Sequence, residues 1–127
     1  MNVTVVDASA LIAVLLVEAK AEAVVSRLTD RKLAAPSLIS FEIAAVCAMR
    51  LRRDRQRASL FREALRVFED LNVATWPVDI FAVFELADGT GLTAYDASYL
   101  WLARELGAEL VTLDAELQRA YDAMTGP

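Results

Sequence analysis

The order of the apolar segments is the feature that most constrains the fold of this chain. Short runs rich in β-branched residues, the first at residues 3–6, alternate with longer stretches in which apolar residues recur at helical spacing. The sequence predicts strands at residues 3–6, 33–35, 73–76 and 109–113, and helices at 10–16, 19–28, 36–53, 60–71, 80–87, 95–106 and 115–123. Strands separated by helices in this way indicate an α/β fold with a central, mainly parallel sheet and helices on both faces.

Proline and glycine set several of the predicted boundaries. Pro36 and Ser37 are expected to open the long third helix, since proline is favoured in the first helical turn. Residues 88–91, with Gly89 and Gly91, are expected to form a loop, and Gly107 is expected to end the helix before the last strand. The first strand, residues 3–6, is short, β-branched and mostly apolar, which predicts a central position in the sheet.

The length and composition favour one compact intracellular domain. The 127 residues suffice for one hydrophobic core, and 57% of them are hydrophobic. The longest apolar stretch, residues 8–17, is too short to span a bilayer, and residues 1–4 lack the positive charge of a signal peptide. The single cysteine, Cys47, cannot form an internal disulfide and is expected to be a small buried hydrophobe. We therefore expect residues 1–127 to form a single cytoplasmic domain.

The charged residues exclude several classes of mechanism. The chain has a net charge of −5 and no histidine, so a histidine general base, a serine–histidine triad and the usual zinc sites are all excluded. An acidic protein also binds nucleic acid poorly, because phosphate contacts need lysine or arginine. Any chemistry on nucleic acid would therefore have to be mediated by a cation.

Four carboxylates occupy positions where the predicted fold would bring them together. Asp7 follows the first strand and Asp114 follows the fourth, while Asp96 and Glu42 lie early in two of the helices. In open parallel sheets, functional groups collect at the carboxyl ends of the strands. The sequence therefore predicts that these four side chains converge at one edge of the sheet.

Each acid also has a structural interpretation. Asp7 and Asp114 could be helix N-caps, and Asp96 could belong to a capping box with Thr93. Glu42 shares a helix face with apolar residues, so its carboxylate should be partly buried and should need either an arginine partner or a metal ion. These interpretations remain open at the level of the sequence.

If the acids meet, a hard divalent cation is the expected partner. Mutual repulsion would raise their pKa values, and Mg²⁺ or Mn²⁺, which prefer oxygen ligands, would relieve it. Such ions activate water and neutralise a scissile phosphate without help from histidine or lysine, as in many nucleases. Ser9 and Thr112 lie two residues from Asp7 and Asp114, and we expect them to hydrogen-bond the carboxylates or a metal-bound water.

Four segments resemble the acidic motifs of the PIN-domain ribonucleases, in particular the VapC-type toxins of bacterial toxin–antitoxin pairs. The segments are residues 5–12, 40–43, 92–100 and 110–114, and they carry Asp7, Glu42, Asp96 and Asp114 in that order. The resemblance implies a PIN-like (Rossmann-like) three-layer α/β/α sandwich with a four- or five-stranded sheet. It further implies a Mg²⁺- or Mn²⁺-dependent endoribonuclease, inhibited by a VapB-type antitoxin and assembled as a homodimer within a larger toxin–antitoxin complex. The family commonly has a further strand after the last helix, whereas nothing in residues 121–127 is strand-like.

One basic cluster stands out in this acidic chain, and it has two interpretations. Its members are Arg50, Arg52, Arg53, Arg55 and Arg57. Arg50 and Arg53 could guide RNA phosphates toward the site, or the cluster could simply stabilise the negative end of a helix dipole. The aromatic residues, mostly in apolar runs, give no sign of a platform for stacking bases.

Other functional classes fit the sequence less well. A phosphoacceptor receiver domain needs a late lysine, but the only lysines are Lys20 and Lys32. A haloacid-dehalogenase-type phosphatase needs an aspartate where Ser9 stands, and residues 89–91 do not form a phosphate-binding glycine loop. The remaining alternative is a non-catalytic module that keeps the PIN fold and acts in a regulatory complex with its antitoxin.

Overall fold

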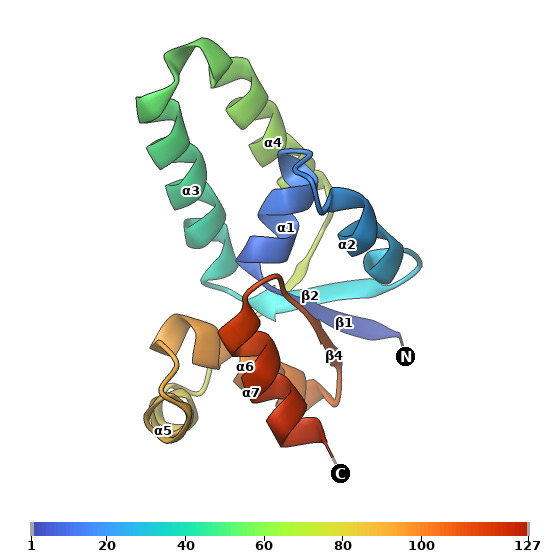
Figure 1. Cartoon of the computed structure of the whole chain (residues 1–127), viewed down its shortest axis with the longest axis vertical. Helices are drawn as coiled ribbons and strands as arrows, with labels where there is room; N and C mark the ends of the chain where they lie inside the picture. The colour runs from blue at the N-terminus through green and yellow to red at the C-terminus, as the bar shows by residue number, and fades with distance from the viewer. Residues whose placement is uncertain (1, 127) are drawn as a thin grey trace.

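A parallel sheet of four strands forms the middle of the structure, a computed structural model that describes residues 2–126 (Figure 1). The strands are β1 (Val3–Val6), β2 (Lys32–Pro36), β3 (Ala74–Trp76) and β4 (Glu109–Val111), in the spatial order β3-β2-β1-β4. β1 pairs with both β2 and β4, which confirms its predicted central position. Its residues Thr4, Val5 and Val6 are fully buried, as expected for a strand covered on both faces.

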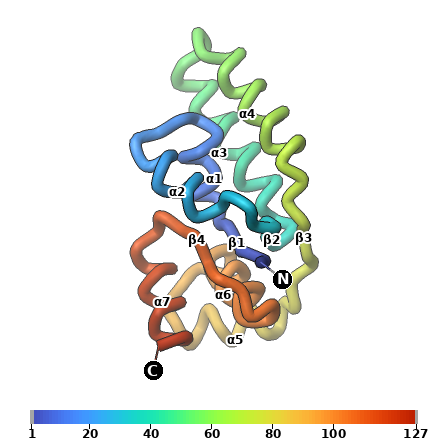
Figure 2. Tube along the Cα trace, turned by 90° about the vertical axis from the view of Figure 1, so that its right-hand side faces the viewer, coloured from blue at the N-terminus to red at the C-terminus, as the bar shows by residue number. Residues whose placement is uncertain are grey.

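Helices cover both faces of the sheet. The helices are α1 (Ala8–Leu15), α2 (Ala21–Leu28), α3 (Ile39–Arg53), α4 (Ala58–Asp70), α5 (Ile80–Thr90), α6 (Ala94–Leu106) and α7 (Ala115–Thr125), and a short 3₁₀ turn, η1 (Arg55–Arg57), joins α3 to α4. Figures 1 and 2 show α1 to α4 on one side of the sheet and α5 to α7 on the other. The predicted three-layer α/β/α architecture is therefore confirmed. None of the helices in the described part of the chain is long and apolar enough to cross a membrane.

Two of the predicted boundaries are wrong, and both errors have a local cause. Pro36 does not open a helix: it is the last residue of β2 and is paired with Trp76, whose carbonyl accepts the N–H of Ser37 at 2.9 Å. The pairing with β3 thus holds this segment extended, and α3 begins only at Ile39. Residues 88–90 are not a loop, because α5 continues through them to Gly91, whose φ of 76° ends the helix.

The sheet ends at β4 within the described residues. After β4 the chain enters α7, which runs to Thr125, and no fifth strand follows it up to residue 126. The sequence predicted this departure from the family pattern. The carboxyl ends of β1, β2 and β4 lead toward the first turns of α1, α3 and α7, which places those turns at one edge of the sheet (Figure 1).

Candidate active site

Asp7 is the most deeply buried of the four predicted acids, with only 3% of its surface exposed. It is the N-cap of α1: its Oδ1 accepts the N–H of Ala10 at 3.0 Å and the hydroxyl of Ser9 at 2.8 Å. Its Oδ2 accepts the hydroxyl of Thr112 at 2.6 Å. Burial raises the pKa of Asp7 in spite of these hydrogen bonds, and the charge of Asp114 raises it further. Asp7 is thus a helix cap and, at the same time, a destabilised anion.

The end of β4 is joined to the first turn of α1 by a hydroxyl network. Thr112 donates to Asp7 and accepts the N–H of Asp114 at 3.0 Å, while Ser9 accepts the N–H of Leu113 at 3.0 Å. Asp114 in turn caps α7 by accepting the N–H of Leu117 at 3.0 Å. The hydrogen bonds expected of Ser9 and Thr112 are therefore present, and their part in holding a metal ion stays a prediction.

Glu42 is held by a tyrosine. The hydroxyl of Tyr99, a side chain that is 1% exposed, donates to Glu42 Oε1 at 2.6 Å. Burial raises the pKa of Glu42, and the charges of Asp7 and Asp96 add to this. Burial and the neighbouring Glu42 carboxylate raise the pKa of Tyr99 well above its ordinary value, so the tyrosine stays a donor. The sequence analysis considered an arginine as the partner of Glu42, but in the structure Tyr99 is its hydrogen-bond partner.

Tyr99 is the site residue that the sequence analysis missed. It lies three residues after Asp96 on α6, so the two share a helix face. That spacing is the signal that could have found it.

Asp96 occupies the first turn of α6. Its N–H donates to the hydroxyl of the N-cap residue Thr93 at 3.1 Å, so half of the predicted capping box is formed. Partial burial raises the pKa of Asp96. The charges of Asp114 and Asp7 raise it further, and the charge of Glu116 does so more weakly. Each of the four acids therefore lies within electrostatic reach of at least one of the others.

The four acids form a negative site that is not neutralised by an ion pair within the described residues. None of the ion pairs found within residues 2–126 involves any of them. In this conformation, no three acidic or cysteine side chains of the described residues are grouped as a ready-made metal site. Mg²⁺ does not need such a group, because it keeps several waters and is commonly bound through one or two carboxylates. The oxygen donors and their mutual repulsion thus fit a hydrated divalent cation.

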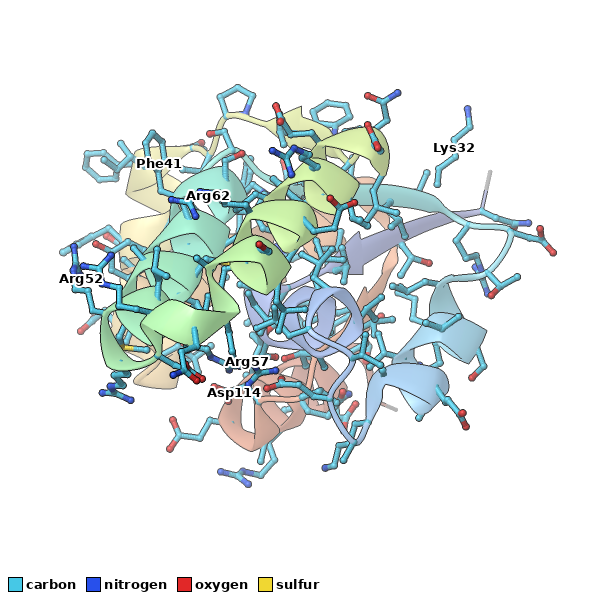
Figure 3. The ribbon with its side chains drawn as sticks, turned by 90° about the horizontal axis from the view of Figure 1, so that it is seen from above. Lys32, Phe41, Arg52, Arg57, Arg62 and Asp114 are labelled. Atoms are coloured by element: carbon cyan, nitrogen blue, oxygen red, sulfur yellow. The ribbon has the colours of Figure 1, made fainter. Side chains whose placement is uncertain are left out.

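Arg50 and Arg53, the predicted RNA contacts, lie toward the far end of α3. Arg50 Nη1 is 2.8 Å from Glu18 Oε2, and Arg53 is exposed in the last turn of the helix. At 1.5 Å per residue, Arg53 lies about 16 Å along the helix axis from Glu42. Figure 3 labels Asp114 close to Arg57, but Figure 1 places the turn that carries Arg57 at the tip of the α3–α4 hairpin, away from the start of α7. These positions support the interpretation of a solvated helix end.

Comparison with known proteins identifies the class of this α/β domain. The PIN domain model matches residues 4–123, so the chain belongs to the PIN domain family. It is 38% identical to the VapC ribonuclease Mb0985 of Mycobacterium bovis over 115 residues, covering 89% of this chain and 87% of that protein. It is 30% identical to ribonuclease VapC3 of Pyrobaculum aerophilum over 128 residues, covering 97% and 98% of the two chains. Among solved structures, PAE2754 from Pyrobaculum aerophilum superposes with a TM-score of 0.74 at 28% identity, over 92% of this chain and 84% of that one.

The stability of the metal-free protein is expected to fall as the pH rises from about 4. Asp7, Glu42 and Asp96 all have raised pKa values in the folded state, so the folded chain retains protons that the unfolded chain releases. Their contribution is fully present below the unfolded pKa and is lost as the pH rises through the folded values. Urea unfolding in a chelator, at a series of pH values, measures this slope. The Asp7→Asn variant should show a shallower loss than the wild type, and identical slopes would contradict the argument.

Proposed function

We propose that this protein is a Mg²⁺- or Mn²⁺-dependent endoribonuclease that acts as the toxin of a toxin–antitoxin pair. The observation that carries the proposal is the buried carboxylate of Asp7, which interacts electrostatically with the other three acids and forms no ion pair within residues 2–126. A fold that keeps such an anion unpaired loses stability unless a cation binds there. The ribonuclease names of the relatives support RNA as the substrate.

The four acids share one task in the proposed reaction. Asp7, Asp96, Asp114 and Glu42 would hold the cation, directly or through its waters. Thr112 and Ser9 fix the orientation of Asp7 through hydrogen bonds, and Tyr99 fixes that of Glu42. When bound, the metal supplies a water of lowered pKa and neutralises the charge that develops on the scissile phosphate.

The relatives and one surface of the chain support the proposed partners. The VapC names support an antitoxin of the VapB type and a cytoplasmic toxin–antitoxin assembly. Ile80, Phe81 and Phe84 on α5 are 78%, 74% and 64% exposed, an apolar surface that supports a homodimer. Sedimentation of the purified protein tests the homodimer, and a monomer at micromolar concentration would contradict it.

Metal removal tests the proposed reaction directly. We expect the purified protein to cleave single-stranded RNA in Mg²⁺ or Mn²⁺, to lose all cleavage in a chelator, and to recover it when the metal is restored. Gel analysis of an end-labelled RNA measures this. Cleavage that persists in the chelator would overturn the metal mechanism. Absence of cleavage, together with tight binding to the antitoxin, would instead establish the non-catalytic module.

A further inference from the structure

A groove of about 760 Å³ between α5, α6 and α7 carries two arginines. Arg104 lies near the end of α6, and Arg119 lies on the second turn of α7. Residues 89–92, where α5 ends and the chain turns toward α6, also line it. Figure 1 shows these three helices together on one side of the sheet. We call this feature the arginine groove.

One end of the arginine groove adjoins the four acids. Glu116, a lining residue in the first turn of α7, is two residues from Asp114, and its charge acts on Asp96. Leu92, another lining residue, directly precedes Thr93, the N-cap of the helix that carries Asp96. The groove therefore begins beside the candidate active site and extends away from it along α7.

The arginines supply positive charge where the proposed reaction needs it. RNA approaching the four acids meets a negative field in a protein of net charge −5, so affinity for its backbone requires local cations. Neither Arg104 nor Arg119 forms an ion pair with any carboxylate in residues 2–126, and both are exposed. Arg50, in contrast, is engaged by Glu18.

The shape of the groove suits a strand that lies along a helix. From Glu116 to Ala123 the α7 wall is about 10 Å long, at 1.5 Å per residue. Glu116 repels phosphate at the end beside the acids, whereas Arg119 and Arg104 attract it further along. A bound backbone would thus be held beyond the acids and would reach them only at one end.

We propose that the arginine groove binds the phosphate backbone of single-stranded RNA adjacent to the bond that is cut, with Arg104 and Arg119 contacting phosphates. This inference rests on the proposed ribonuclease function and adds the path that the substrate follows. Both arginines are positioning residues, since they bind the strand away from the reacting phosphate.

The experiment compares three double variants with the wild type. Arg104→Gln/Arg119→Gln removes both charges from the groove, and Arg104→Lys/Arg119→Lys retains them. Arg52→Gln/Arg62→Gln removes the same number of charges from the α3–α4 hairpin, where Figure 3 shows both side chains. Cleavage kinetics are measured in Mg²⁺, and fluorescence anisotropy follows binding of a labelled single-stranded RNA of about 12 nucleotides to each protein in chelator.

The glutamine variant of the groove is expected to raise KM and the RNA dissociation constant about tenfold, to leave kcat within about twofold, and to flatten the salt dependence of binding. The lysine variant and the hairpin variant should bind and cleave nearly as the wild type does. Unchanged KM and anisotropy in the glutamine variant would contradict RNA binding in the arginine groove. An equal loss of RNA affinity in the hairpin variant would contradict it as well. If the wild type binds RNA through these arginines but never cleaves it, the proposed ribonuclease function is wrong and the inferred RNA-binding groove is still supported.

Discussion

Asp7→Asn is expected to lower metal-dependent RNA cleavage by at least about 100-fold while leaving the protein folded. Asparagine retains an oxygen that can accept the N–H of Ala10, and its amide can donate to the hydroxyl of Thr112, which then turns to accept. What the substitution removes is the negative charge of the most buried acid. If Asp7 is a metal ligand as proposed, the substitution weakens metal binding and the cleavage that depends on it.

Two further measurements distinguish this loss from misfolding. Without metal, Asp7→Asn should be more stable than the wild type at neutral pH, because a buried charge with a raised pKa has been removed. Mg²⁺ should raise the Tm of the wild type but not that of the variant. Asp88→Asn, which removes an exposed carboxylate of α5, is the matched control and should behave as the wild type. Cleavage by Asp7→Asn within tenfold of the wild type would rule out the assigned role.

Truncation of Tyr99 is expected to have the largest effect on stability. Tyr99→Ala empties a fully buried aromatic site, and such truncations destabilise by roughly 3–5 kcal/mol. Tyr99→Phe keeps the ring and removes only the hydrogen bond to Glu42, which should lower the free energy of unfolding by about 1.5–3 kcal/mol. Urea unfolding at neutral pH measures both changes.

The paired control for Tyr99→Phe is Tyr121→Phe. The hydroxyl of Tyr121 donates to the neutral carbonyl of Ala108 at 3.1 Å, so its removal should destabilise by only about 0.5–1.5 kcal/mol and leave cleavage unchanged. Tyr99→Phe should also lower kcat, since Glu42 then has no fixed orientation. Equal losses of stability in the two variants would show that the Glu42 contact has no special strength.

The alternation of strands and helices was sufficient to predict the three layers and the central place of β1. The strands are short and carry mostly apolar residues, and parallel pairing then follows from the helical connections. The predicted positions of Asp7 and Asp114 after the first and fourth strands also agree with the structure, because an N-cap aspartate marks where a strand gives way to a helix. The segment around Pro36 was misassigned because its pairing with Trp76 is a tertiary contact that local preferences do not encode.

The hydrogen bond between Tyr99 and Glu42 could not be predicted from the sequence either, because it is also a tertiary contact. Tyr99 and Glu42 are 57 residues apart, and only the approach of α6 to α3 brings them together. The arginine groove likewise depends on how three helices pack around one hollow. In contrast, Thr112 and Ser9 were found because each lies two residues from an acid.

The hydrogen bond between Asp7 and Thr112 joins residues that are 105 positions apart. During synthesis, Asp7 therefore leaves the ribosome 105 residues before Thr112. A nascent chain, or a fragment that stops before β4, therefore holds only part of the acidic cluster. By this geometry, the acidic cluster next to a translating ribosome stays incomplete until β4 and the residues after it have emerged.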